Sequence, residues 1–189
     1  MWEIICGIGL IALPILFLLL VIGYVIMMYN KFINLKNAIE NGFKQIQVGL
    51  KKRADMIGQL VETTKGQIKF EKDVMTGVAK LRSAPMGNPA EAKKADKLGA
   101  SVLGKLFAVM ENYPNLRSVE AVTNLQNSIK DNEDEIARLR YLYNDQVQTF
   151  NMMAERIPTN FIASIFGFKK KEYLEFEKEI EKRPDTKIY

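Results

Sequence analysis

An uncharged stretch near the N-terminus, Ile4–Met28, constrains this chain more than any other feature. Its 25 residues, rising about 1.5 Å each, would form a helix of roughly 37 Å, enough to cross a hydrocarbon core of about 30 Å. A cleaved signal peptide would carry positive charge at its start and a cleavage site such as Ala-x-Ala. Residues 1–30 contain no Lys or Arg and no Ala-x-Ala sequence. The stretch therefore predicts a retained transmembrane helix.

The charges on the two sides of this span predict its orientation. Glu3 is the only charged residue before it, whereas residues 31–53 carry six basic side chains and one acid. Cytoplasmic flanks are rich in Lys and Arg. We therefore expect a single-pass protein of the cell membrane, with residues 1–29 as a short external N-terminus and span and the remainder in the cytoplasm.

Beyond residue 30 the chain carries 27 basic and 21 acidic residues, a net charge of +6. This mild excess favours the anionic surface of the lipid bilayer as a partner. Nucleic acid is not expected as a partner, because clusters of basic residues with aromatic platforms are missing.

The soluble remainder has the apolar periodicity of helices. From Phe32 to Ile68 apolar residues recur at separations of three and four, which predicts that the first helix continues out of the membrane. We expect it to end near Arg82, where the segment 83–88 has the composition of a loop. The sequence Asn88-Pro89-Ala90-Glu91 then supplies an N-cap, a proline at the first helical position and a capping-box glutamate.

Two further breaks divide the rest of the chain. The second helix should end at Tyr113-Pro114, the third should run from about Val119 to Ile157, and a short apolar element covers 160–166. Short connections favour antiparallel neighbours. We therefore predict an all-α fold in which the transmembrane helix continues into a long helix of an antiparallel up-down bundle of about four helices. The bundle would occupy residues 30–168, and 169–189 would form a charged tail.

The expected helices differ in length. At about 1.5 Å per residue the first would reach roughly 75 to 80 Å and the second only about 35 Å, so part of the first would lack an internal partner. Its apolar stripe is then either bundle core or an interface between copies, since an exposed stripe favours a homo-oligomer. The stripe consists of Phe32, Leu35, Ile39, Phe43, Ile46 and Leu50.

Several kinds of chemistry are missing from the sequence. It has no histidine, and Cys6, its only cysteine, lies in the predicted span. These absences remove Ser-His-Asp and Cys-His mechanisms, His-based metal sites, zinc fingers and disulfides. A carboxylate run at Asp131 and Glu133–Glu135 is typical of a solvated helix face. We therefore expect no enzymatic activity, cofactor or metal.

One segment matches a nucleotide-binding motif in spacing only. Gly99–Lys105 has the glycine and lysine positions of a Walker A loop, but Leu106 stands where the magnesium-binding Ser or Thr belongs. The segment also lies within a helical pattern rather than after a strand. We interpret it as a chance match.

Arg53 is a charged residue within the apolar stripe. At about 100° per residue it falls in line with Ile46 and Leu50, and a buried charge there needs a partner. Glu133 lies between Ile129 and Ile136 on the stripe of the third helix. An Arg53–Glu133 ion pair is one hypothesis. The alternative is that Arg53 extends to solvent along the edge of the bundle.

A second group of residues lies near the C-terminal end of the bundle. Five apolar residues are followed directly by three lysines, a pattern that suits contact with a membrane surface. The alternative is that the aromatic residues close one end of the bundle. The group consists of Phe161, Ile162, Ile165, Phe166, Phe168, Lys169, Lys170 and Lys171.

Several motifs together resemble the LemA family over nearly the whole chain. They are the run Gln45–Ile57, then Leu60–Gly66, Glu111-Asn112-Tyr113-Pro114, and Pro158-x-Asn160-x-x-Ala163-x-x-Phe166-Gly167-Phe168. The chain departs from the family pattern at Phe43, where many members have tryptophan, at Gly58, where proline is usual, and at Phe70, where histidine is common.

The resemblance implies an anchor with its N-terminus outside and a cytoplasmic helical bundle, without an agreed activity or established catalytic residues. It also implies a relation to MamQ-type magnetosome proteins, which are associated with forming internal membranes. As partners it suggests membrane metalloproteases of the HtpX type or TPM-domain proteins, whose genes often neighbour those of the family.

These features together predict a non-enzymatic, membrane-anchored protein that self-assembles and organises or shapes the membrane. The alternative is a signalling or adaptor module that binds a cytoplasmic partner or regulates a membrane protease.

Overall fold

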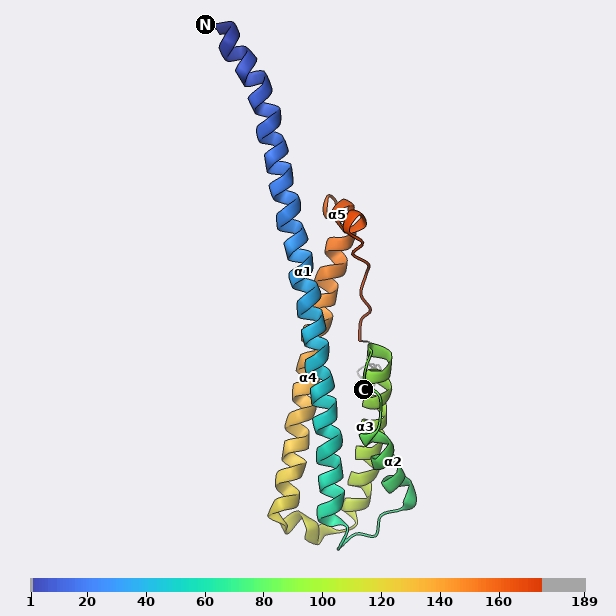
Figure 1. Cartoon of the computed structure of the whole chain (residues 1–189). Coiled ribbons are helices and arrows are strands. Elements are labelled where there is room, and N and C mark those ends of the chain that lie inside the picture. The colour runs from blue at the N-terminus through green and yellow to red at the C-terminus, as the bar shows by residue number, and fades with distance from the viewer. Residues whose placement is uncertain (1, 175–189) are drawn as a thin grey trace, which may run out of the picture. The chain divides into compact units, whose positions relative to one another are not determined.

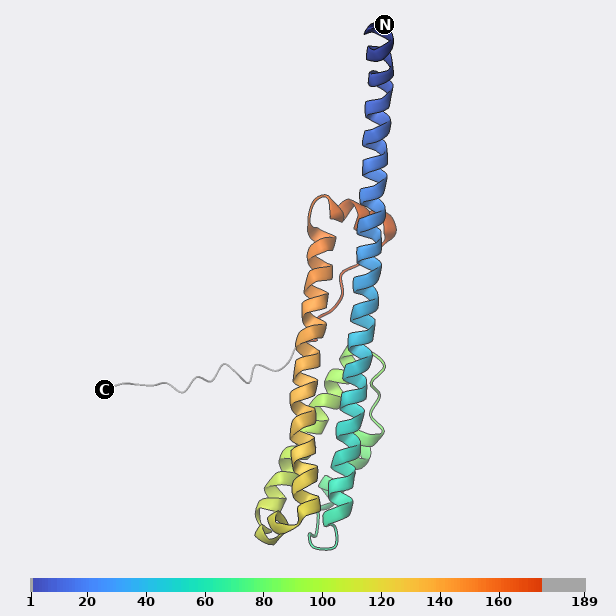
Figure 2. The ribbon, with the colours of Figure 1, turned by 90° about the vertical axis from the view of Figure 1, so that its left-hand side faces the viewer.

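The computed structural model describes residues 2–174, with side chains for 13–116 and 119–174. These residues form five α-helices and a short 3-10 helix, with no strand among them (Figures 1 and 2). The elements are α1 (Trp2–Thr64), α2 (Lys72–Arg82), α3 (Pro89–Glu111), η1 (Pro114–Ser118), α4 (Glu120–Glu155) and α5 (Thr159–Phe166). The predicted all-α fold with a long apolar first helix is confirmed. Most of the predicted tail, residues 175–189, lies outside the described residues.

The expected end of the first helix near Arg82 is wrong, because α1 ends at Thr64. The Thr64 hydroxyl donates to the Leu60 carbonyl at 2.7 Å, and residues 65–67 form a turn. Ile68 lies beyond the end of α1 but is still buried in the core. For this reason the apolar periodicity of the sequence continues past Thr64, although the helix does not. The part of α1 after residue 29 is therefore roughly 50 Å long, about as long as the 36-residue α4. The 23-residue α3 reaches about 35 Å, so the predicted mismatch between the first two bundle helices is smaller than expected but remains.

The start of α3 follows the sequence prediction. The Asn88 side chain accepts a hydrogen bond from the Glu91 N–H at 2.9 Å, and Pro89 occupies the first helical position. The Glu91 carboxylate accepts from the Gly87 N–H at 2.8 Å, one residue before the position expected for a capping box. The loop 83–88 is thus closed by reciprocal bonds that satisfy two backbone donors.

The chain divides into two compact units, each made from separate stretches of sequence. Unit 1 contains residues 2–42 and 142–172, and unit 2 contains residues 43–141 and 173–174 among those described. The predicted division at residues 30 and 169 stays a prediction. Helices α1 and α4 each contribute one part to each unit.

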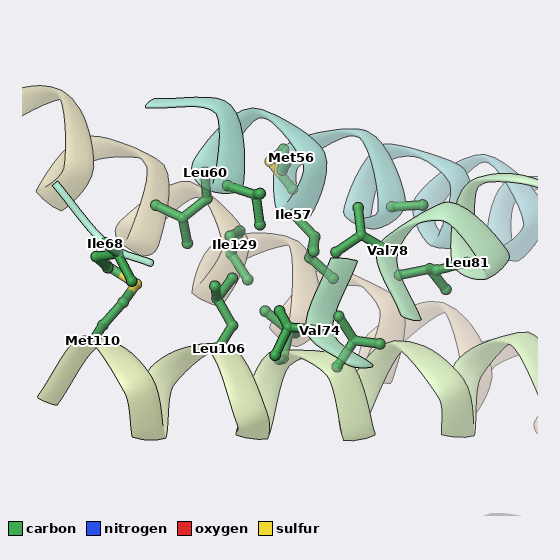
Figure 3. Packing of buried hydrophobic residues seen from close by; sticks show 14 of the residues in the cluster. Met56, Ile57, Leu60, Ile68, Val74, Val78, Leu81, Leu106, Met110 and Ile129 are labelled. Atoms are coloured by element: carbon green, nitrogen blue, oxygen red, sulfur yellow. The ribbon is translucent and has the colours of Figure 1, made fainter. Parts of the chain in front are cut away.

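Unit 2 contains the main hydrophobic core, which Figure 3 shows from close by. Side chains from α1, α2, α3 and α4 interdigitate there, and burial of each contributes about 1.5–3 kcal/mol. The labelled members are Met56, Ile57, Leu60, Ile68, Val74, Val78, Leu81, Leu106, Met110 and Ile129, all of them buried. Within this unit α1 and α4 are antiparallel. Gly49 of α1 lies against Ile136 of α4, and one turn later in α1 Arg53 bonds to Glu133, which comes one turn earlier in α4.

Unit 1 is held together by aromatic rings and by the segment that follows α5. Phe32 of α1 packs edge-on against Phe150 of α4, with ring centroids 5.5 Å apart. Gly167 has a φ of 72°, a left-handed conformation that ends α5 and that glycine adopts without strain. This turn brings Phe168 onto Phe32, stacked at 4.7 Å.

Two side chains of α4 bind the backbone after this turn. Asn151 donates to the Lys171 carbonyl at 2.9 Å and accepts from the Lys171 N–H at 2.8 Å, and the Tyr143 hydroxyl donates to the Glu172 carbonyl at 3.1 Å. Burial raises the pKa of the Tyr143 hydroxyl, and the nearby charge of Glu172 raises it further. The segment 168–172 is thereby fixed along α4.

Candidate functional site

Arg53 is the most deeply buried charged residue among those described, with only 1% of its surface exposed. One terminal nitrogen, Nη1, donates to both carboxylate oxygens of Glu133 at 3.0 Å. The other, Nη2, donates to the Asp96 carboxylate at 2.7 Å and to the Asp96 carbonyl at 3.0 Å. The structure thus brings Arg53 and Glu133 together, and it adds Asp96, which the sequence analysis missed.

Arg53 occupies a special place in the packing of α1. Every seventh residue of α1 from position 32 to position 60 is buried. Four of these residues are apolar, namely Phe32, Ile39, Ile46 and Leu60, and the fifth is Arg53. A polar residue in such a row costs stability but specifies which residues of the partner helix lie opposite. The four bonds of Arg53 therefore define the register of α1 against α3 and α4 within unit 2.

Arg140 completes the network, because its guanidinium also pairs with the Asp96 carboxylate. Burial lowers the pKa of Arg140, and the negative charge of Asp96 opposes that effect. An arginine remains charged in proteins and has no acceptor atom. The two arginines and two carboxylates thus balance each other, an arrangement suited to holding helices together rather than to moving protons.

Gly99 makes room for this network. A Cβ at position 99 would lie 2.7 Å from Nη2 and 2.8 Å from Cζ of Arg53, closer than real Cβ contacts. Gly99 and Gly104 lie inside α3 rather than in a loop, so the Walker A spacing has no phosphate-binding geometry. The small buried residues Ala92, Ala95 and Gly99, spaced by three and four, are the sequence signal that could have indicated a close approach here.

Asn132 is a second buried polar residue that the sequence analysis missed. Its side-chain amide donates to the Gly49 carbonyl of α1 at 3.1 Å. A groove of about 440 Å³ opens beside it, and Val48 on its wall is 68% exposed. The groove is lined by Lys44, Gln45, Val48, Gly49, Lys52, Asn132, Glu135 and Leu139.

The predicted stripe is buried against the protein's own helices. Phe32, Ile39, Ile46 and Leu50 are buried, and Leu35 and Phe43 are half-buried. Within residues 32–50 of α1 none of the six stripe residues is fully exposed, so this segment does not supply the exposed stripe that was one premise of the expected self-assembly.

The structure divides the predicted membrane-surface residues into two sets. Ile162 is buried and Phe168 is half-buried in unit 1. Phe161 and Ile165 are 63% and 77% exposed, and Phe166 is exposed as well. Of the three lysines, Lys169 and Lys170 are exposed, Lys171 is half-buried, and Lys170 pairs with Glu155.

The described part of α1 from Leu13 includes a segment long and apolar enough to cross a membrane, and none of that segment is buried. No group of three or more His, Cys, Asp or Glu side chains in the described chain is placed to hold a metal ion. The fold and the span together define a helical membrane protein with one candidate span near its N-terminus.

Comparison with known proteins gives the family. Residues 42–188 match the LemA family, and the chain belongs to it. The chain is 26% identical over 195 residues to "Magnetosome protein MamQ 2" of Paramagnetospirillum magneticum, covering 88% of this chain and 72% of the relative. It is equally 26% identical to "Magnetosome protein MamQ" of Magnetospirillum gryphiswaldense, covering 87% and 71% of the two chains. "Protein LemA" of Metamycoplasma hominis is 26% identical over 159 residues, covering 79% of this chain and 71% of the relative.

Proposed function

We propose that this protein is a membrane-anchored structural protein without enzymatic activity, which self-associates in the membrane and organises or shapes the bilayer. One observation carries the proposal: most of the exposed apolar surface of α1 lies in the predicted span rather than on the stripe beyond it. The stripe of α1 beyond the span is buried or half-buried, whereas in the described part of the span the side chains from Leu13 to Val21 are exposed. Large exposed apolar surfaces mark contacts with lipid or with other proteins.

The buried stripe changes the expected route of assembly. Copies would meet through the span and the neighbouring part of unit 1 rather than through the soluble stripe. Packing of spans favours small residues that let helices approach closely. Gly23 is a small residue in the span, and because a Cβ there would meet no other atom of the chain within 4 Å, its side of α1 is open to another copy.

The relatives and the charge network support the same proposal. Two of the related proteins are named for the magnetosome, which fits a role in organising membrane. The most deeply buried charged group among the described residues, Arg53, is engaged in bonds between helices, which fits a structural role better than a catalytic one.

The mass of the full-length protein extracted from its native membrane in mild detergent tests the proposal. We expect a discrete assembly of many copies, and a smaller assembly for Gly23→Leu than for the volume-conserving control Leu20→Met. A monomer or dimer in the unmodified protein would overturn self-assembly.

A second candidate function rests on the groove in unit 2. Its exposed Val48, flanked by Lys44 and Lys52, would suit an acidic amphipathic segment of a cytoplasmic partner. Under this alternative the protein is an adaptor, or it regulates a membrane metalloprotease of the HtpX type or a TPM-domain protein. Copurification with full-length protein tests it, since Val48→Glu should release the partner while the exposed control Met75→Glu should retain it.

A further inference from the structure

We propose that α5 is a docking helix that inserts its exposed apolar face into the surface of the same bilayer that α1 crosses, with the adjoining lysines bound to anionic lipid headgroups. The inference holds whether the protein self-assembles or acts as an adaptor. It concerns unit 1 alone.

The position of α5 along α1 is the first argument. The uncharged stretch ends at Met28, and Lys31 is the first basic residue after it, so α1 leaves the hydrocarbon near Tyr29. The ring of Phe166 lies 4.8 Å from the ring of Tyr29, and that of Phe168 lies 5.8 Å from it. In both ribbon views α5 lies beside α1 where the free N-terminal part of α1 begins (Figures 1 and 2). Helix α5 is therefore held at the level of the bilayer surface.

The second argument is the division of α5 into two faces. Ile162 and Ala163 are buried and attach the helix to unit 1. Phe161 and Ile165, four residues apart, share the opposite exposed face, and Ile157 just before α5 is 78% exposed. A helix with one apolar face that lies at the interface sinks about 5–10 Å into the boundary between headgroups and acyl chains.

The third argument is the charge next to this face. Residues 155–172 contain four basic side chains against the acids Glu155 and Glu172, a net charge of +2. Lys170 pairs with Glu155. Lys169 is exposed. The Asn151 side chain bonds to the backbone of Lys171 and so fixes the segment that carries Lys169 and Lys171. Basic residues at this level attract the anionic lipids of a membrane surface.

The bilayer is the occupant that the geometry favours. The exposed face continues directly from a segment that must itself lie in lipid, so covering it requires no second molecule. Tyr29 links the two, because aromatic residues prefer the headgroup level.

Fluorescence of the full-length protein in vesicles tests the proposal. Trp2 is the only tryptophan, so Trp2→Phe removes the background signal. Phe161→Trp in that background reports on α5, and Val48→Trp, at a similarly exposed position in unit 2, is the matched control. The vesicles contain phosphatidylcholine and phosphatidylglycerol, with bromine on the acyl chains as a quencher.

We expect brominated lipid to reduce the emission of Phe161→Trp about twofold or more, because a ring about 5–10 Å below the surface lies near the bromine atoms. The Val48→Trp control should keep its emission. Adding Lys169→Gln and Lys171→Gln to the Phe161→Trp protein should weaken its quenching in phosphatidylglycerol vesicles and should bring it to the level seen in phosphatidylcholine alone.

Three results would overturn the proposal. Emission of the Phe161→Trp protein at the wavelength of water-exposed tryptophan, without quenching, would mean that α5 faces solvent. A blue shift without quenching would mean that protein covers the face, and dependence of that shift on protein density would identify a second copy. Equal quenching of the Phe161→Trp and Val48→Trp proteins would mean that α5 contacts lipid no more than an exposed position of unit 2 does, so that it is not a docking helix.

Discussion

The contact between Gly99 and Arg53 allows a quantitative test of the charge network. In Gly99→Ala the new Cβ would lie 2.7 Å from Nη2 and 2.8 Å from Cζ of Arg53. Since non-bonded atoms prefer about 3.5 Å, the guanidinium must move by roughly 0.8 Å. Its bonds to Asp96, at 2.7 and 3.0 Å, would then be lost. Two bonds to a charged group contribute about 3–6 kcal/mol, and the helix gains about 1 kcal/mol from alanine, so we expect a net loss of about 2–5 kcal/mol.

Thermal unfolding of the full-length protein in detergent, followed by circular dichroism at 222 nm, measures this loss. We expect Tm to fall by roughly 4–20 °C. Gly104→Ala in the same helix is the matched control, because a Cβ there meets no other atom within 4 Å, and it should raise the free energy of unfolding by up to about 1 kcal/mol.

A double-mutant cycle isolates the contact. In an Arg53→Met background the guanidinium is gone, so Gly99→Ala should become neutral or stabilising. If Gly99→Ala lowered Tm equally in both backgrounds, the clash with Arg53 would not be the cause, and the role given to Gly99 would be wrong.

Three further predictions concern other parts of the molecule. Ile39→Glu should unfold the protein rather than only dissociate it, since Ile39 is buried, whereas Lys36→Glu at an exposed position should not; circular dichroism and mass measured together distinguish the outcomes. Asn151→Ala removes both side-chain bonds to Lys171, so trypsin should cleave at 169–171 faster than in the exposed control Gln148→Ala. Burial raises the pKa of Tyr143 in the folded state above its ordinary 10.0, so as the pH rises the tyrosine ionises first in the unfolded state. The contribution of Tyr143 to stability is therefore full below pH 10.0 and is lost as the pH rises above 10.0. Tyr143→Phe should reduce this loss of Tm between about pH 9 and 11, and an unchanged loss would contradict the assignment.

The sequence predicted the helices well where start signals and periodicity agreed. The order Asn88, Pro89 and Glu91 located the start of α3, and Pro114 and Pro158 located two breaks. The break after Thr64 was missed because Ile68 and Val74 continue the apolar pattern while they pack into the same core from a different segment. Periodicity reports burial, and it does not reveal whether the chain has turned.

The network was predictable only in part. Arg53 and Glu133 each interrupt an apolar stripe, and that irregularity pointed to a pair. Asp96 interrupts nothing, because it lies among the lysines of α3 and resembles a solvated residue. Its role depends on the close approach of α3 to α1 at Gly99, which the small residues Ala92, Ala95 and Gly99 indicate, but which does not by itself single out Asp96 as the partner of Arg53.

The pairing of Arg53 with Glu133 also has a consequence for synthesis of the chain. The two residues are 80 positions apart, so at about 5–20 residues per second Arg53 waits roughly 4–16 s for this partner to emerge from the ribosome. During that interval the span has already been made, and the stripe next to it has no α4 to cover it. The nascent chain must therefore pass through a stage in which the apolar stripe of α1 is uncovered beside the translocation machinery. A chaperone has its best opportunity to act at this stage.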